Sequence, residues 1–207
     1  MIDPGLPLAP KLAYTAFLAV MIPVYLRRYG PTNFLYFCDV AMLLTLVGVW
    51  REDPLWLSVS AVGILLPQAF WLLDFFCRMF GRPLTGMTAY MFESQRSLFL
   101  RGLSLFHGWL PLYLLWAVSR TGYDPRALPI WSLLAAVLLL VCYFWMPPPR
   151  VDRDLRPVNI NYVWGMSDDR PQTWMPPLAW LALQILGAPV LLYWPAHWML
   201  TRWMPAA

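Results

Sequence analysis

Long apolar runs separated by short polar segments dominate the pattern of this chain. Each run has roughly 18 to 24 residues, and about 20 helical residues cross the hydrocarbon layer of a bilayer. We therefore predict an all-α fold, a polytopic membrane helical bundle of about six transmembrane helices that forms one domain over residues 1–207. The predicted spans are residues 8–26, 33–50, 55–76, 97–119, 127–145 and 177–200.

The composition agrees with a lipid environment. Hydrophobic residues make up 60% of the chain and charged residues 13%, whereas soluble domains carry about 25% charged residues. The thirteen Trp residues include many near the ends of the apolar runs, where indole rings favour the membrane–water interface. All three Cys residues fall within apolar runs, which argues against a disulfide framework. We expect an integral membrane protein of a bacterial inner (cytoplasmic) membrane.

The loop cations predict the orientation of the bundle. Six spans place the loops alternately on two sides, and one side carries Lys11, Arg51, Arg120, Arg126 and Arg202. The other side carries Arg27, Arg28, Arg78, Arg82, Arg96, Arg101, Arg150, Arg153, Arg156 and Arg170. Because cations mark the cytoplasmic side, both termini are expected on the non-cytoplasmic side. The cations are spread over short loops instead of one soluble face, so we expect no nucleic-acid partner.

A few polar side chains lie within or beside the predicted spans, where they are costly and need a reason. At 1.5 Å per residue, Asp39 lies within about 10 Å of the cytoplasmic face and His107 about 15 Å deep. The loop that contains Asn159, Asn161 and Tyr162 starts and ends on the same side. We therefore predict that these groups converge on one polar cavity that opens to the cytoplasm.

The candidate chemistry of this cavity is acyl transfer on a lipid that enters from the bilayer. His107 is the candidate general base, and Cys38 the candidate nucleophile. Asp39 would orient the imidazole; alternatively, Ser104, one helical turn before His107, or water would attack. Each group also has an ordinary role, such as packing for Cys38 and helix–helix hydrogen bonding for Asp39 or His107.

The loop residues are the candidate substrate-binding groups. The amide of Asn159 or Asn161 would donate to an oxyanion, and Tyr162 and Ser104 would complete the substrate site. The alternative is that the two Asn side chains only hold the loop against the bundle.

Several other classes of site lack support in the sequence. His197 lies near the opposite face from His107, so the two cannot ligate one haem, and no His or Cys pair has zinc spacing. We predict no metal site. No Gly-rich phosphate loop follows a strand, and no inverted repeat indicates a transporter.

Three short segments resemble known membrane enzymes. Phe34-Leu-Tyr-Phe-Cys-Asp39 is similar to the start of the second helix in the androgen-induced integral-membrane hydrolases, and His107 with Leu110-Pro111 resembles their His segment. Asn161-Tyr162 is similar to an element of a related Cys/His transmembrane acyltransferase group. The resemblance implies lipid-ester chemistry with His107 as a catalytic residue. Where the hydrolases have a Thr nucleophile this chain has Tyr36, so Cys38 would take that role from another helical face.

We therefore predict an intramembrane lipid hydrolase or acyltransferase with membrane lipid as its partner. The alternative is a non-catalytic structural subunit of a larger membrane complex with other membrane proteins, because the chain is rich in Trp and its loops are short. A small transporter and a pigment- or quinone-associated protein also stay open, and the cofactor is unknown.

Overall fold

The computed structural model describes residues 5–152 and 154–207, which are all-helical and contain no β-strand. The helices are α1 (Leu8–Arg28), α2 (Phe37–Arg51), α3 (Pro54–Met79), α4 (Leu98–Ser104), α5 (Phe106–Thr121), α6 (Ala127–Trp145), α7 (Pro177–Ala188) and α8 (Trp194–Trp203). Four short elements are η1 (Pro31–Leu35), η2 (Ala89–Phe92), η3 (Ile160–Tyr162) and the π-helical η4 (Pro189–Tyr193). Arg153, one of the cations counted above, lies outside the described residues.

Five helical stretches are long and apolar enough to cross a membrane: 8–28, 54–79, 98–121, 127–145 and 177–203. The second predicted span is the exception, because α2 has only 15 residues, and at 1.5 Å per residue it covers about 22 Å. The segment before α2 forms η1 instead, which begins with Pro31 after Gly30 in a positive-φ conformation. The chain is thus an integral membrane protein whose second helix is shorter than predicted.

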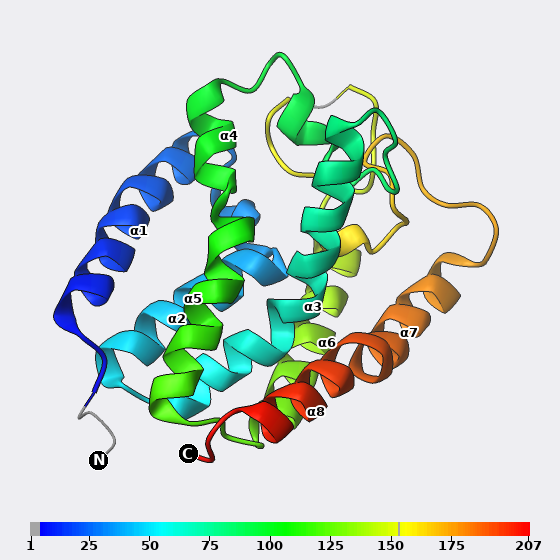
Figure 1. Cartoon of the computed structure of the whole chain (residues 1–207). Coiled ribbons are helices and arrows are strands. Elements are labelled where there is room, and N and C mark those ends of the chain that lie inside the picture. Colours follow the sequence, from blue (N-terminus) through cyan, green and yellow to red (C-terminus); the bar gives the residue numbers. More distant parts are fainter. Residues whose placement is uncertain (1–4, 153) are drawn as a thin grey trace.

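The fourth predicted span is divided into two helices that follow one another (Figure 1). Leu105 separates α4 from α5 with φ −65° and ψ −4°, and the Gly108 amide bonds to the Leu105 carbonyl at 2.9 Å. The carbonyl of Ser104 is therefore free of the usual bond from Gly108. This local break matters for the position of His107.

The helices run alternately up and down in Figure 1, so one end of the bundle gathers the start of α1, the α2–α3 turn and the α5–α6 turn. Lys11 forms an ion pair with Glu52 there, and the Asp124 amide donates to Ser58 Oγ at 3.0 Å. The C-terminal residues join them, because the Tyr123 amide donates to the Pro205 carbonyl at 2.7 Å.

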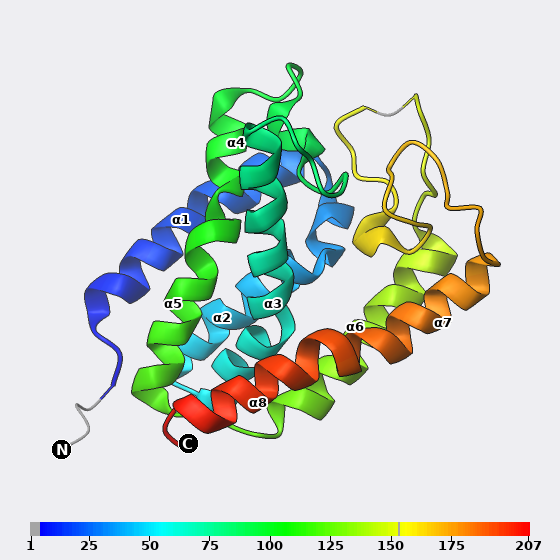
Figure 2. The same cartoon turned by 45° about the vertical axis from the view of Figure 1, so that its right-hand side comes forward.

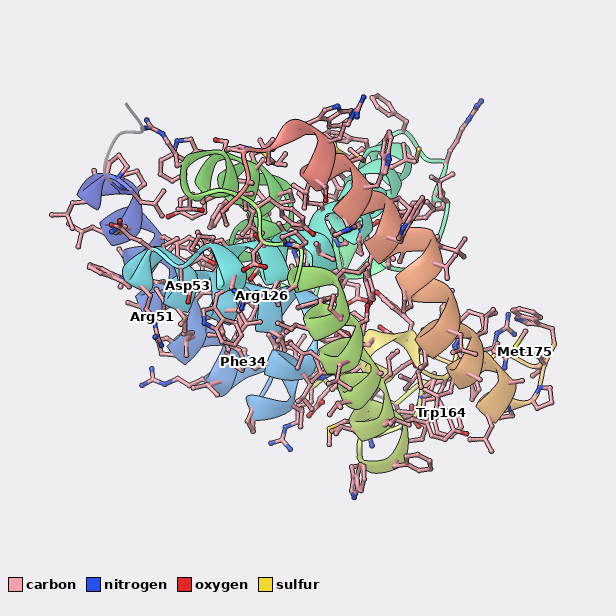
Figure 3. All side chains as sticks on the ribbon, turned by 90° about the horizontal axis from the view of Figure 1, so that it is seen from below. Phe34, Arg51, Asp53, Arg126, Trp164 and Met175 are labelled. Carbon is pink, nitrogen blue, oxygen red and sulfur yellow. The ribbon has the colours of Figure 1, made fainter. Side chains whose placement is uncertain are left out.

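Seen from this end in Figure 3, Arg51, Asp53 and Arg126 lie near the α2–α3 turn and the start of α6. Trp164 and Met175, from the long connection between α6 and α7, lie well away from them. Figure 1 shows the two long connections, between α3 and α4 and between α6 and α7, at the opposite end of the bundle.

The centre of the bundle is α3, which packs against α2, α5, α6 and α8. Small residues allow these close contacts, as in other membrane helix pairs. Gly63 of α3 faces the indole of Trp131 on α6, and a Cβ at this position would overlap the ring. Ser60 of α3 donates to the Ala41 carbonyl of α2 at 3.0 Å, which ties the short second helix to the core.

Candidate functional site

A cavity of about 520 Å³ lies between α3, α5, the start of α2, the long connections and the α7–η4 segment. Its size is that of a small-molecule or lipid-headgroup site. Figure 2 shows α7 and α8 lying across the front of the bundle, with α6 behind them. The predicted site residues that line the cavity are Cys38, Asp39, Ser104, His107, Asn161 and Tyr162. Asn159, also predicted, is fully buried behind the cavity wall.

His107 is fixed in one orientation by the break between α4 and α5. Its Nδ1 atom lies 2.7 Å from the Ser104 carbonyl oxygen. Because a carbonyl only accepts, Nδ1 must carry the proton, and Nε2 of the neutral ring keeps its lone pair. The Trp71 ring stacks on the imidazole with centroids 4.6 Å apart, and Phe106 lies 4.2 Å away. These two ring contacts hold the imidazole in the orientation in which Nδ1 meets the Ser104 carbonyl.

Asp39 is the most deeply buried acidic group of the cavity, with an exposed fraction of 2%. Its Oδ2 accepts a hydrogen bond from Asn33 Nδ2 at 3.0 Å. Its Oδ1 has no partner in the described part of the chain. Asp39 therefore does not orient His107 through a direct hydrogen bond in this structure, although both residues line the same cavity.

The two candidate attacking groups, Ser104 and Cys38, differ in the hydrogen bonds that they already make. Ser104 Oγ donates to the Leu100 carbonyl at 3.3 Å and lies 2.9 Å from the Tyr25 hydroxyl, so its proton is already used. Cys38 is a free thiol that is partly buried and lines the cavity. Of these two groups, the thiol is the better placed to meet a ligand.

The two asparagine amides hold the long α6–α7 connection together. Asn161 accepts from the Phe37 amide at 3.0 Å and donates to the Leu35 carbonyl at 2.9 Å and to Cys142 Sγ at 3.5 Å. It thereby fastens η3 to the start of α2.

Asn159 donates to the carbonyls of Gly165 and Ser167 at 2.7 and 3.0 Å, and accepts from the Trp164 amide at 2.9 Å. All four amide N–H groups of Asn159 and Asn161 are thus engaged. This arrangement favours the structural role over the predicted oxyanion role, for which an N–H would first have to be released.

Tyr162 supports the cavity through its backbone as well as its ring. Its carbonyl accepts from Trp180 Nε1 at 2.9 Å and from Gln184 Nε2 at 3.3 Å, both on α7. It adopts a positive φ of 59°, directly after Asn161 at 57°. Such φ values cost energy for residues other than Gly, so contacts of the surrounding residues must stabilise this turn.

Several lining residues were not among the predicted ones, because tyrosines and a loop arginine carry no motif. They are Tyr25, Tyr29, Tyr36, Gln68, Trp71, Tyr90 and Arg96. Gln68 was detectable, since it is a polar residue in the middle of an apolar run beside Pro67. Burial raises the pKa of Tyr90 and of Tyr162, both in the connections, so their phenols stay protonated hydrogen-bond donors.

Two further polar residues of the spans lie outside the cavity. The carboxylate of Asp74, near the end of α3, accepts from the amides of Leu84, Thr85 and Thr88 at 2.6 to 3.1 Å. It therefore orders the start of the α3–α4 connection. His197 lies 2.6 Å from the Tyr123 hydroxyl through Nδ1, at the other end of the bundle.

Within residues 5–152 and 154–207, no group of three or more His, Cys, Asp or Glu side chains is arranged to hold a metal ion. No family model matches the chain, and neither a curated protein nor a solved structure matches it. The similarity of the three short segments to the hydrolases and acyltransferases therefore stays a prediction.

Proposed function

We propose that the chain is a membrane protein that takes an amphipathic lipid from the bilayer into its cavity. The observation that carries this proposal is the division of the cavity wall into two kinds of surface. Asp39, Gln68, His107, Tyr90 and Arg96 form a polar side. The more apolar side comes from α7 and η4, where Gln184 lies among Leu183, Gly187, Ala188, Leu191 and Leu192.

The apolar side also supports entry from the membrane. Leu183 and Leu191 line the cavity, and 49% and 69% of their surface is exposed. These exposed leucines support an opening of the cavity toward lipid at α7. A ligand with an apolar chain can lie against these leucines while its polar group meets the opposite wall, which avoids exposing that group to hydrocarbon.

The test is to fill the cavity from α7. A Cβ at Gly187 makes only ordinary contacts, at 3.8 Å to Leu183 and 4.0 Å to Leu191, so this cavity-lining position can take the larger side chain of Gly187→Trp. The purified variant is expected to retain less co-purifying lipid than wild type, measured by native mass spectrometry. Leu186→Trp is the matched control, because Leu186 is 71% exposed and does not line the cavity. Equal lipid retention by Gly187→Trp and wild type would contradict the proposal.

A second candidate function is cleavage or transfer of an acyl group of that lipid. The specific observation in its favour is the Nδ1–H bond from His107 to Ser104, which leaves Nε2 as a proton acceptor. Cys38 would then be the nucleophile: its thiol proton passes to Nε2, its sulfur bonds to the acyl carbon, and the alcohol leaves with that proton. Water completes hydrolysis of the thioester, or an acceptor alcohol completes transfer.

A further inference from the structure

Among the described residues that line the cavity, Asp39 is the one Asp, Arg or His with a side chain almost inaccessible to solvent. Its described partner is the uncharged amide of Asn33, and its Oδ1 has none. A buried charge without a partner costs several kcal/mol, so a proton or a cation must compensate it.

No cation of the described chain does so. Arg96 of the cavity wall forms an ion pair with Glu93, with Nε 3.2 Å from the Glu93 Oε2. Of the other acids of the wall, Asp154 is exposed and lies 3.8 Å from Arg156, so its charge is already compensated. A positively charged occupant of the cavity can therefore supply the compensation that Asp39 lacks.

The aromatic wall favours the same charge. The cavity is lined by Tyr25, Tyr29, Tyr36, Tyr90 and Tyr162, together with two Trp rings. Arg96 shows how these rings receive a cation, because its guanidinium carbon lies 5.1 Å from the Tyr29 ring centre and 5.2 Å from that of Tyr90. Rings and a carboxylate are the groups that recognise ammonium ligands in proteins.

We infer that the cavity selects amphiphiles with a cationic ammonium headgroup, and that Asp39 Oδ1 is the counter-ion. This inference rests on the proposed lipid binding and specifies its substrate class. The ammonium group is either a primary amine, which donates hydrogen bonds to Asp39, or a quaternary amine, which relies on the rings. The apolar chain of the ligand lies against Leu183 and Leu191.

The test uses the full chain purified in an uncharged maltoside. It is titrated with four single-chain amphiphiles of equal chain length: dodecylammonium, dodecyltrimethylammonium, an uncharged dodecyl alcohol and dodecyl sulfate. Native mass spectrometry measures the bound fraction. We expect wild type to bind an ammonium form about tenfold more tightly than the alcohol, which corresponds to about 1.4 kcal/mol.

Asp39→Asn keeps the shape of the side chain and removes its charge. This variant is expected to lose the ammonium preference and to bind the alcohol as wild type does. Asp154→Asn is the matched control, because Asp154 lines the cavity but is exposed, and it should keep the preference. A stronger response to dodecylammonium assigns the selectivity to hydrogen bonding, and a stronger response to the trimethyl form assigns it to the rings. Both results support the inference.

Equal binding of the ammonium forms and the alcohol by wild type, or an unchanged preference in Asp39→Asn, would overturn the inference. The wild-type comparison requires no variant to fold. If the Gly187→Trp variant binds less alcohol than wild type, the lipid-binding proposal survives that result. If wild type binds none of the four amphiphiles, the lipid-binding proposal fails as well.

Discussion

The imidazole Nδ1 of His107 is bonded to the Ser104 carbonyl across the break between α4 and α5, at 2.7 Å. This one contact satisfies a carbonyl that the broken helix leaves without its usual amide. At the same time it fixes which nitrogen of His107 faces a ligand as a base. A local irregularity of the backbone thus sets the chemistry of a side chain inside the membrane.

The first prediction concerns the catalytic candidate. If acyl chemistry occurs, wild type in native membranes should be labelled by a cysteine-directed lipid-ester probe. Cys38→Ala should abolish the labelling, and His107→Ala should lower it by about 10²- to 10⁴-fold, the usual contribution of a general base. Cys77→Ala is the control, because Cys77 is also a partly buried free thiol but does not line the cavity. Labelling that persists in Cys38→Ala would exclude this nucleophile.

The second prediction concerns the loop that Asp74 organises. Its carboxylate accepts three backbone bonds and one from the Thr88 hydroxyl. Asp74→Asn should weaken this loop by about 2 kcal/mol, because bonds to a charged acceptor are lost. Hydrogen exchange at the amides of Leu84, Thr85 and Thr88 should accelerate, while exchange in the core of α6 should not. Unchanged exchange at these amides would contradict the structural role.

The third prediction concerns the contact between α3 and α6. Gly63→Ala should destabilise the bundle by about 1 to 3 kcal/mol, since the added methyl group overlaps the Trp131 ring. Gly102→Ala is the control, because nothing lies within 4 Å of its Cβ position and Ala favours a helix by up to about 1 kcal/mol. Thermal unfolding in detergent should show a lower midpoint only for Gly63→Ala. A midpoint equal to wild type for this variant would contradict the close packing.

The fourth prediction concerns pH and the α5–α6 turn. The guanidinium of Arg126 bonds to both carboxylate oxygens of Asp124, at 2.6 to 3.1 Å, and holds the pKa of Asp124 below its ordinary value. Because the pKa of Asp124 is lower in the folded state, its ionised form stabilises the fold at pH values above the unfolded-state pKa of about 3.9. That contribution is lost as the pH falls through the folded-state pKa.

The measurement compares the free energy of unfolding of wild type and Asp124→Asn across this range. Wild type should be the more stable near neutral pH, and the difference should shrink below about pH 4. Asp154→Asn, whose contact with Arg156 is exposed, should show little difference at any pH. A difference between wild type and Asp124→Asn that stays constant down to about pH 3 would contradict the assignment.

The sequence by itself determined the helical membrane fold, because about 20 consecutive apolar residues have only one stable spanning form in lipid. The bounds of α6 matched the prediction at both ends, since Ala127–Trp145 is a continuous apolar run. The sequence also indicated His107, Asp39 and Cys38 as candidate site residues, because polar atoms within apolar runs are costly.

Only the tertiary structure decided the rest. The shortness of α2 depends on η1, where Gly30 and Pro31 turn the chain before the helix begins. The roles of Asn159 and Asn161 depend on backbone groups that lie up to 126 positions away in the chain, as with Asn161 and Leu35. The tyrosines and Arg96 line the same cavity as Asp39 but come from segments with no shared motif. Sequence periodicity reports which face of a helix is apolar, whereas the partner of a polar atom is set by how distant segments pack.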